Sequence, residues 1–148
     1  MTFPHTIDVD APVVVRRRIT IDAPAAPVWR IHTDIDAWPS WNPGIETARL
    51  NDPFAVGATF RWLTGGLDIE STVYQVVPGE HVIWGGPAHG ITGIHLWTFT
   101  EEDGRTVVST EESWSGDPVL AQPREMHRLL DESLEAWLRH LKTAAEQA

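Results

Sequence analysis

The spacing of apolar residues divides the chain into a β-rich part and a helical end. Apolar and polar residues alternate over 13–21, which predicts a strand with most of its valines and isoleucines on one face. Arg17 falls on that apolar face and interrupts it. A short helix is predicted at 27–32, since proline is tolerated in a first turn. The prolines and the glycine of 36–44 leave room there only for a turn or one more short helix.

Residues 45–116 have the composition of strands separated by turns. Candidate strands occupy 45–50, 57–64, 67–77, 81–84, 91–100 and 106–114. Asp103-Gly104 is the strongest turn signal and predicts a hairpin between the last two strands. Strands at this spacing without intervening helices indicate an antiparallel meander.

A long amphipathic helix is predicted after the turn at Gly116-Asp117-Pro118. Its apolar stripe consists of Met126, Leu130, Leu134, Trp137 and Leu141. These residues recur at spacings of three and four, and charged residues occupy the other side. The helix is expected to run from about residue 123 to the mid-140s, roughly 30 Å at 1.5 Å per residue.

The order of these elements predicts the fold class. An antiparallel sheet buries one face and needs a cover, and the final helix is the only adequate one. We therefore predict an α+β fold in which a seven-stranded curved antiparallel sheet wraps around a long C-terminal helix, with two short helices after the first strand. Because the sheet is wider than the helix, a space between them is expected.

Several short segments resemble one protein family in their order along the chain. Residues 21–29 (Ile-Asp-Ala-Pro-Ala-Ala-Pro-Val-Trp) and 33–43, with Thr-Asp followed by Trp-Pro-Ser-Trp-Asn-Pro, are similar to the opening of START-like, or helix-grip, proteins. Val73–Pro78 with Trp84 resembles the middle strands, and 141–146 resembles the helix end. The likeness is to the bacterial polyketide cyclase/dehydrase (SRPBCC) branch. It implies a helix-grip fold with an internal pocket, and it specifies fold better than function.

The resemblance also implies which strand faces line the pocket. The chain has eight tryptophans beside a single tyrosine, and alternation on the strands places many of these rings on common faces. An aromatic wall is expected from Phe60, Trp62, Trp84, Trp97 and Phe99. Further residues expected at the ligand are Ser71, His32, His89, Trp41 and Trp137. The alternative is that the rings pack against the final helix and leave no space.

Two of these histidines have competing interpretations. His32 lies where the family usually has an apolar residue, so it is either a pocket group or, as we expect, a capped or partly exposed histidine. His89 lies in the loop 85–90 near the expected pocket mouth, where loops often gate ligands. A solvent-exposed histidine is the other interpretation of His89.

His95 is the polar residue with the clearest chemical potential. A two-residue turn at Asp103-Gly104 places His95 opposite Glu112, and a loop one residue longer places it opposite Glu111. A carboxylate beside an imidazole in an apolar cleft fixes the tautomer and is expected to raise the imidazole pKa, as in a general acid/base. The alternative is a cross-strand pair without chemistry, worth about 0.2–1 kcal/mol.

Length and charge restrict the number of domains and the classes of binding partner. The chain has 148 residues, which fits a single START-like domain with residues 1–12 as an N-terminal extension. Its net charge of −10 disfavours nucleic-acid binding. The basic cluster Arg16-Arg17-Arg18 is better explained as a solvated strand face than as a phosphate site.

Other classes of site and location are disfavoured by the sequence. No apolar run approaches the roughly 20 residues of a membrane span, and no signal peptide is evident, so we expect a cytoplasmic protein without membrane insertion, as a monomer or homodimer. Cysteine is absent. Histidine spacings typical of metal sites are also missing, so neither a metal nor a cofactor is expected.

Two functions remain open from the sequence. The first is a cofactor-free enzyme similar to polyketide cyclases and dehydratases, with His95 and Glu111 or Glu112 transferring protons on a small hydrophobic or aromatic molecule. The second is a carrier or sensor that binds a lipophilic ligand without turnover. A protein-interaction module is a third possibility that the resemblance allows.

Overall fold

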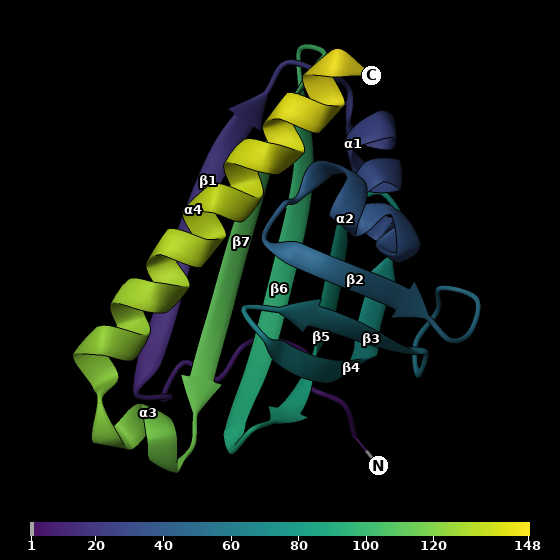
Figure 1. Cartoon of the computed structure of the whole chain (residues 1–148). Coiled ribbons are helices and arrows are strands. Elements are labelled where there is room, and N and C mark those ends of the chain that lie inside the picture. Colours follow the sequence, from purple (N-terminus) through teal and green to yellow (C-terminus); the bar gives the residue numbers. More distant parts are fainter. Residues whose placement is uncertain (1) are drawn as a thin grey trace.

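A computed structural model describes residues 2–148 (Figure 1). The elements in chain order are β1 (Val13–Ile21), α1 (Ala25–Thr33), η1 (Ile35–Ala37), α2 (Trp38–Trp41), β2 (Ile45–Leu50), β3 (Thr59–Thr64), β4 (Leu67–Val77), β5 (His81–Ala88), β6 (Ile91–Glu102), β7 (Arg105–Ser115), α3 (Asp117–Ala121) and α4 (Pro123–Gln147). The strands form one antiparallel sheet in the order β1-β7-β6-β5-β4-β3-β2. The predicted α+β helix-grip fold is confirmed.

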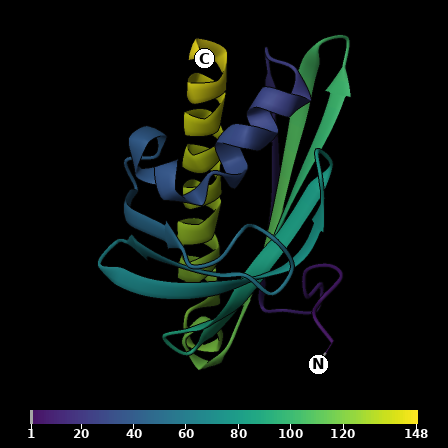
Figure 2. The same cartoon turned by 90° about the vertical axis from the view of Figure 1, so that its right-hand side faces the viewer.

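The sheet bends around α4, which lies along its concave side. Figure 2 shows the curved sheet partly surrounding the helix, with α1 and α2 beside the C-terminal half of α4. The apolar stripe of α4 faces the sheet: Leu130, Leu134 and Leu141 are buried, as is Trp137. No helix within residues 2–148 is long and apolar enough to cross a membrane.

Two elements differ from the sequence prediction. β5 does not end at Trp84 but continues through Gly85, Gly86 and Pro87 to Ala88, paired with β6 throughout. Glycine permits this continuation because the strands approach closely: a Cβ on Gly85 would lie 2.1 Å from the Gly93 carbonyl oxygen. The segment predicted as a turn before α4 contains the short helix α3, with its proline in the first turn.

Arg17 interrupts the apolar face of β1 for a structural reason. Its side chain extends from the strand to α4, where Nε and Nη2 donate hydrogen bonds to the two carboxylate oxygens of Asp131 at 2.7 and 2.9 Å. Paired planar contacts of this kind fix orientation as well as adding energy. The arginine therefore joins the edge strand to the helix instead of leaving an unpaired charge between them.

The segment before β1 also lies against the sheet. Ile7 is buried, and the Asp8 amide donates a hydrogen bond to the Ser113 hydroxyl at 3.0 Å. The Phe3 ring lies 5.1 Å from that of Tyr74, centroid to centroid. Ser113 follows the cavity-lining Glu112 on β7 and so points to the opposite face of the sheet. The N-terminal residues therefore cover part of the face away from α4.

The close approach at Gly85 leads to a stability prediction. We expect Gly85→Ala to lower the free energy of unfolding by about 1–3 kcal/mol, because its Cβ would meet the backbone of β6, which cannot rotate away. Urea denaturation measures the difference. Gly93→Ala is the matched control on the neighbouring strand, since its Cβ would meet nothing closer than 3.5 Å. Equal losses in the two variants would contradict this account of β5.

Candidate functional site

A cavity of about 550 Å³ lies between the sheet and α4. Its walls come from the middle strands and from the part of α4 that faces them, and its volume is in the range of small-molecule sites. The indoles on its walls are Trp62, Trp84, Trp114 and Trp137. Its polar lining includes Ser71, His95 and Glu112, with His89 and His140 also contributing. The space expected from the width of the sheet is therefore present.

Three of these indoles form an inclined group. The ring centroids of Trp62 and Trp84 are 5.8 Å apart with their planes at 88°, and Trp137 lies 5.7 Å from Trp62 and 5.9 Å from Trp84. Such edge-to-face and tilted contacts stabilise aromatic clusters beyond the area they bury. The rings therefore support one another around the cavity without collapsing into a stack.

Trp38 supports this group from behind, and the sequence analysis did not assign it to the site. The ring is fully buried and packs edge-on against Trp137, with centroids 5.3 Å apart and planes at 83°. Its Nε1 donates a hydrogen bond to the His32 carbonyl oxygen at 2.8 Å. Trp38 could have been found from its place in the Trp-Pro segment, on which the family resemblance rests.

The predicted aromatic wall divides into two parts. Trp62 and Trp84 line the cavity, as do the predicted residues Trp137, Ser71 and His89. Phe60, Trp97 and Phe99 do not line it; they are buried in close packing, because α1 and α2 cover their end of the sheet. Trp41 is partly buried, packs against the same core and is also outside the lining. The alternative of close packing thus holds at one end of the sheet only.

The prediction that His32 is capped or partly exposed is wrong. It is 1% exposed, and within residues 2–148 neither ring nitrogen has a hydrogen-bond partner. Its ring lies 4.3 Å from that of Trp97. Burial without a partner disfavours the charged form and lowers the His32 pKa to about 3. His32 is therefore a neutral core residue and does not line the cavity.

The strand register selects Glu112 as the partner of His95. His95 pairs with Glu112 across β6 and β7, as the two-residue turn predicts. Glu111 pairs with Leu96 and points to the opposite face, where it accepts a hydrogen bond from Arg16 Nε at 2.8 Å. The structure therefore brings together His95 and Glu112 and leaves Glu111 outside the cavity.

Two separate hydrogen bonds hold the side chains of His95 and Glu112. Trp114 Nε1 donates to Glu112 Oε2 at 2.8 Å, and His95 Nε2 lies 2.7 Å from the Thr110 hydroxyl. Glu112 Oε1 approaches His95 Nδ1 to 3.1 Å, although the alignment of the two groups is not that of a hydrogen bond. Both side chains line the cavity, so a ligand in it would meet them directly.

Burial sets the protonation of this pair. It raises the Glu112 pKa to about 8, against the smaller opposing effect of the Trp114 hydrogen bond. Burial, with a smaller contribution from nearby His32, lowers the His95 pKa, so the expected increase from a neighbouring carboxylate is wrong. At neutral pH both groups are therefore mainly uncharged, and Glu112 is a proton donor.

Ser71 and His89 differ in exposure. Ser71 is buried, and its hydroxyl accepts a hydrogen bond from Trp62 Nε1 at 3.1 Å, which fixes the position of that indole. His89 is exposed on the turn between β5 and β6 at a φ of 54°, and its Nε2 lies 3.0 Å from the Asp68 carbonyl oxygen. Ser71 thus belongs to the cavity wall, while His89 lies at its solvent side.

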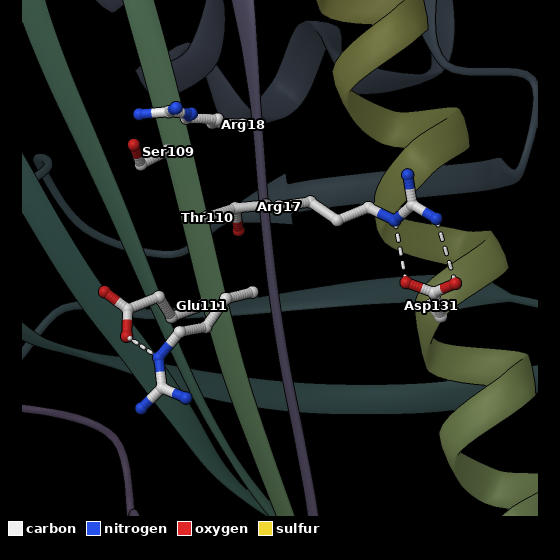
Figure 3. Close-up of a pocket in the computed structure, with 7 residues that line it drawn as sticks. Arg17, Arg18, Ser109, Thr110, Glu111 and Asp131 are labelled. Atoms are coloured by element: carbon white, nitrogen blue, oxygen red, sulfur yellow. Dashed lines mark hydrogen bonds and ion pairs between the residues drawn. The ribbon is translucent and has the colours of Figure 1, made fainter.

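A second hollow, of about 570 Å³, lies at the β1 edge of the sheet (Figure 3). Its lining contains the three arginines of β1, of which Arg16 is paired with Glu111 and Arg17 with Asp131. Arg16 and Arg18 are exposed, as expected for a solvated strand face. Such surface pairs contribute little, and the open, charged lining does not resemble a small-molecule site.

The geometry contains no evident metal site. Within residues 2–148 no three histidine or acidic side chains come together in a way that would hold a metal ion. The polar groups that the described lining presents are one carboxyl group, imidazoles, hydroxyls and an amide.

The family of the chain follows from its sequence and agrees with the fold. Residues 12–146 match the family described as polyketide cyclase / dehydrase and lipid transport, and the chain belongs to that family. No curated protein matches the chain.

Solved structures show the same START-like fold. A START superfamily protein from Mycobacterium smegmatis is 17% identical over 90% of this chain and 97% of its own, with a TM-score of 0.78. A hypothetical protein from Helicobacter pylori is 18% identical over 98% and 99%, with a TM-score of 0.82. The di-domain ARO/CYC BexL of the BE-7585A biosynthetic pathway is 24% identical over 93% of this chain and 52% of its own, with a TM-score of 0.72.

The raised pKa of Glu112 predicts a pH dependence of stability. Its ordinary value is 4.5 and its value in the folded protein is about 8, so the folded state retains a proton that the unfolded state releases. The free energy of unfolding therefore falls as pH rises through this interval. His32, His95 and His140, whose pKa values are lowered, act in the opposite direction below and around their ordinary value of 6.5.

Above about pH 7.5 these histidines are almost fully deprotonated in the unfolded state too, so the slope comes mainly from the carboxyl group. Urea titrations from pH 7.5 to 8.5 should show falling stability in the parent protein and a flatter profile in Glu112→Gln. Glu111→Gln removes the same charge on the opposite face and should keep the parent slope. An unchanged slope in Glu112→Gln would show that Glu112 does not titrate abnormally.

Proposed function

We propose that the protein binds a small, largely apolar or aromatic molecule in the cavity and catalyses a cofactor-free cyclisation or dehydration on it. The observation that carries this proposal is a carboxyl group, neutral at neutral pH, on the wall of an indole-lined cavity. Membership of a family that includes cyclases and dehydrases supports it. So does the likeness in fold to a di-domain ARO/CYC.

Binding would be driven by removal of apolar surface from water. Each Å² of apolar surface buried contributes about 25 cal/mol, before the costs of ordering the ligand. Flat rings suit walls made of Trp62, Trp84 and Trp137, whose positions are set by mutual contacts and by Trp38. The ligand would thus be held in one orientation, and orientation alone supplies a large part of the acceleration in intramolecular reactions.

Proton transfer is assigned to Glu112, with His95 positioning it. In a dehydration, Glu112 gives its proton to the departing hydroxyl, which leaves as water. The resulting carboxylate then takes a proton from the adjacent carbon of the ligand while the double bond forms, which regenerates the acid. A pKa of about 8 suits both steps, because it lies near neutral pH and the carboxyl group can both lose and regain its proton.

His95 and Ser71 complete the assignment. His95 Nδ1 lies 3.1 Å from Glu112 Oε1 and so restricts the position of the carboxyl group, while Nε2 is held by Thr110. The Ser71 hydroxyl uses one lone pair for Trp62 and has its own proton free to hold a carbonyl oxygen of the ligand.

A carrier without turnover is the alternative function. It is favoured by the mainly apolar walls of the cavity and by the lipid transport named in the family's description.

Replacing His95 by alanine distinguishes a catalytic function from a carrier function. We expect His95→Ala to bind an aromatic carbonyl compound with an affinity within about threefold of the parent, because apolar burial drives binding. Conversion should fall, because Glu112 loses the imidazole that positions it. Glu112→Gln, which removes the acid itself, should lower conversion by about 10²–10⁴-fold, as is typical of general acid–base groups. Tryptophan fluorescence quenching measures binding, and product analysis measures conversion of a polyketide-like substrate.

The controls distinguish the two functions. Glu111→Gln, outside the cavity, should retain both binding and conversion. Binding by the parent protein without conversion of any substrate in a broad polyketide-like panel would favour the carrier. Absence of quenching by every compound in such a panel would contradict the cavity as a ligand site.

A further inference from the structure

The distribution of charge around the cavity indicates which ligand charge it favours. Among the described residues, its lining includes no lysine or arginine, and Glu112 is its only acidic side chain. His95 is buried beside this carboxyl group, and His89 and His140 line the cavity elsewhere. The whole chain is also acidic, with a net charge of −10. An anionic ligand would therefore enter without a countercharge and against a repulsive field.

Indoles contact both members of the His95–Glu112 pair. Trp114 donates its N–H to Glu112 Oε2 at 2.8 Å, and Trp84 lies 4.7 Å from His95, centroid to centroid. Trp137 meets the His95 ring edge-on at 5.6 Å. Several aromatic rings inclined to one another around a carboxylate are the arrangement that attracts an organic cation, because each ring face is electron-rich.

The hydrogen bond from Trp114 remains available when Glu112 is ionised. Trp114 Nε1–H donates to Glu112 Oε2, and this oxygen accepts in the carboxylate form as well as in the acid form. The second carboxylate oxygen, Oε1, lies 3.1 Å from His95 Nδ1 without hydrogen-bond alignment and is therefore available to a cationic group of a ligand.

We propose that the cavity selects a ligand with a protonated basic nitrogen, which pairs with Glu112 and contacts the faces of Trp84, Trp114 and Trp137. The inference rests on the binding part of the proposed function and does not depend on turnover. It names the ligand class as a flat apolar molecule bearing an ammonium group. With such a ligand bound, Glu112 is ionised and acts as a proton acceptor.

Three probes of one shape test the charge selection: 2-naphthylmethylammonium, 2-naphthylmethanol and 2-naphthoate. Calorimetric titrations at pH 7.5 give their affinities. We expect the ammonium to bind at least about tenfold more tightly than the carboxylate and more tightly than the alcohol, because cation–π and charge-assisted contacts reach that size. Binding of the alcohol at least as tight as that of the ammonium would overturn the proposal.

Glu112→Gln should weaken ammonium binding by about tenfold, while the alcohol changes by less than about threefold and so reports that the cavity is intact. Glu111→Gln should leave all three affinities unchanged, since its carboxylate pairs with Arg16 outside the cavity. Equal losses for ammonium and alcohol in Glu112→Gln would also overturn the proposal. If the alcohol binds and the ammonium has no advantage, only this inference fails; if no probe binds, the proposed binding function fails with it.

Discussion

The structure depends on a mismatch of width between one helix and a curved seven-stranded sheet. α4 covers only part of the concave face, and the rest must be filled by side chains or left open. At the end beneath α1 and α2 it is filled, by Trp97, Phe99 and His32 among others. Toward the opposite end the cavity persists, because Trp62, Trp84 and Trp137 are braced at steep angles to one another and cannot flatten into the space.

This partial filling explains the electrostatics of the site. A carboxyl group on the wall of an apolar cavity loses contact with water, and the described lining residues include no lysine or arginine to compensate its charge. Its pKa rises, while that of the neighbouring imidazole falls for the same reason. The pair is therefore kept uncharged by its surroundings, and either ligand charge or ligand chemistry can change that state.

Much of this arrangement could be predicted from local patterns. The alternation in β1, the register of the β6–β7 hairpin and the stripe of α4 all follow from short-range rules, so His95 opposite Glu112 was one of two pairings obtained from the turn alone. Continuation of β5 beyond Trp84 was missed, because glycine and proline usually end a strand, and only the close approach of Gly93 explains their presence.

The division of the aromatic wall could not be obtained in the same way. Alternation shows which face Phe60 and Trp97 share, but not that α1 and α2 cover that end of the sheet. For the same reason His32 was expected to be partly exposed. The His95 pKa was expected to rise because the neighbouring carboxylate was considered and the opposing effect of burial in the same cleft was not. Trp114 escaped notice because its role depends on a hydrogen bond to a residue two positions away on its own strand.

The cavity itself is tested most directly by the indole N–H resonances of the eight tryptophans, followed by ¹H–¹⁵N NMR during titration with naphthalene. The account predicts that the resonances of Trp62, Trp84, Trp114 and Trp137 shift. Those of Trp29 and Trp41, which pack against the core outside the lining, should change little. Shifts confined to the second group, or none at all at saturating naphthalene, would show that no open space separates the sheet from the helix.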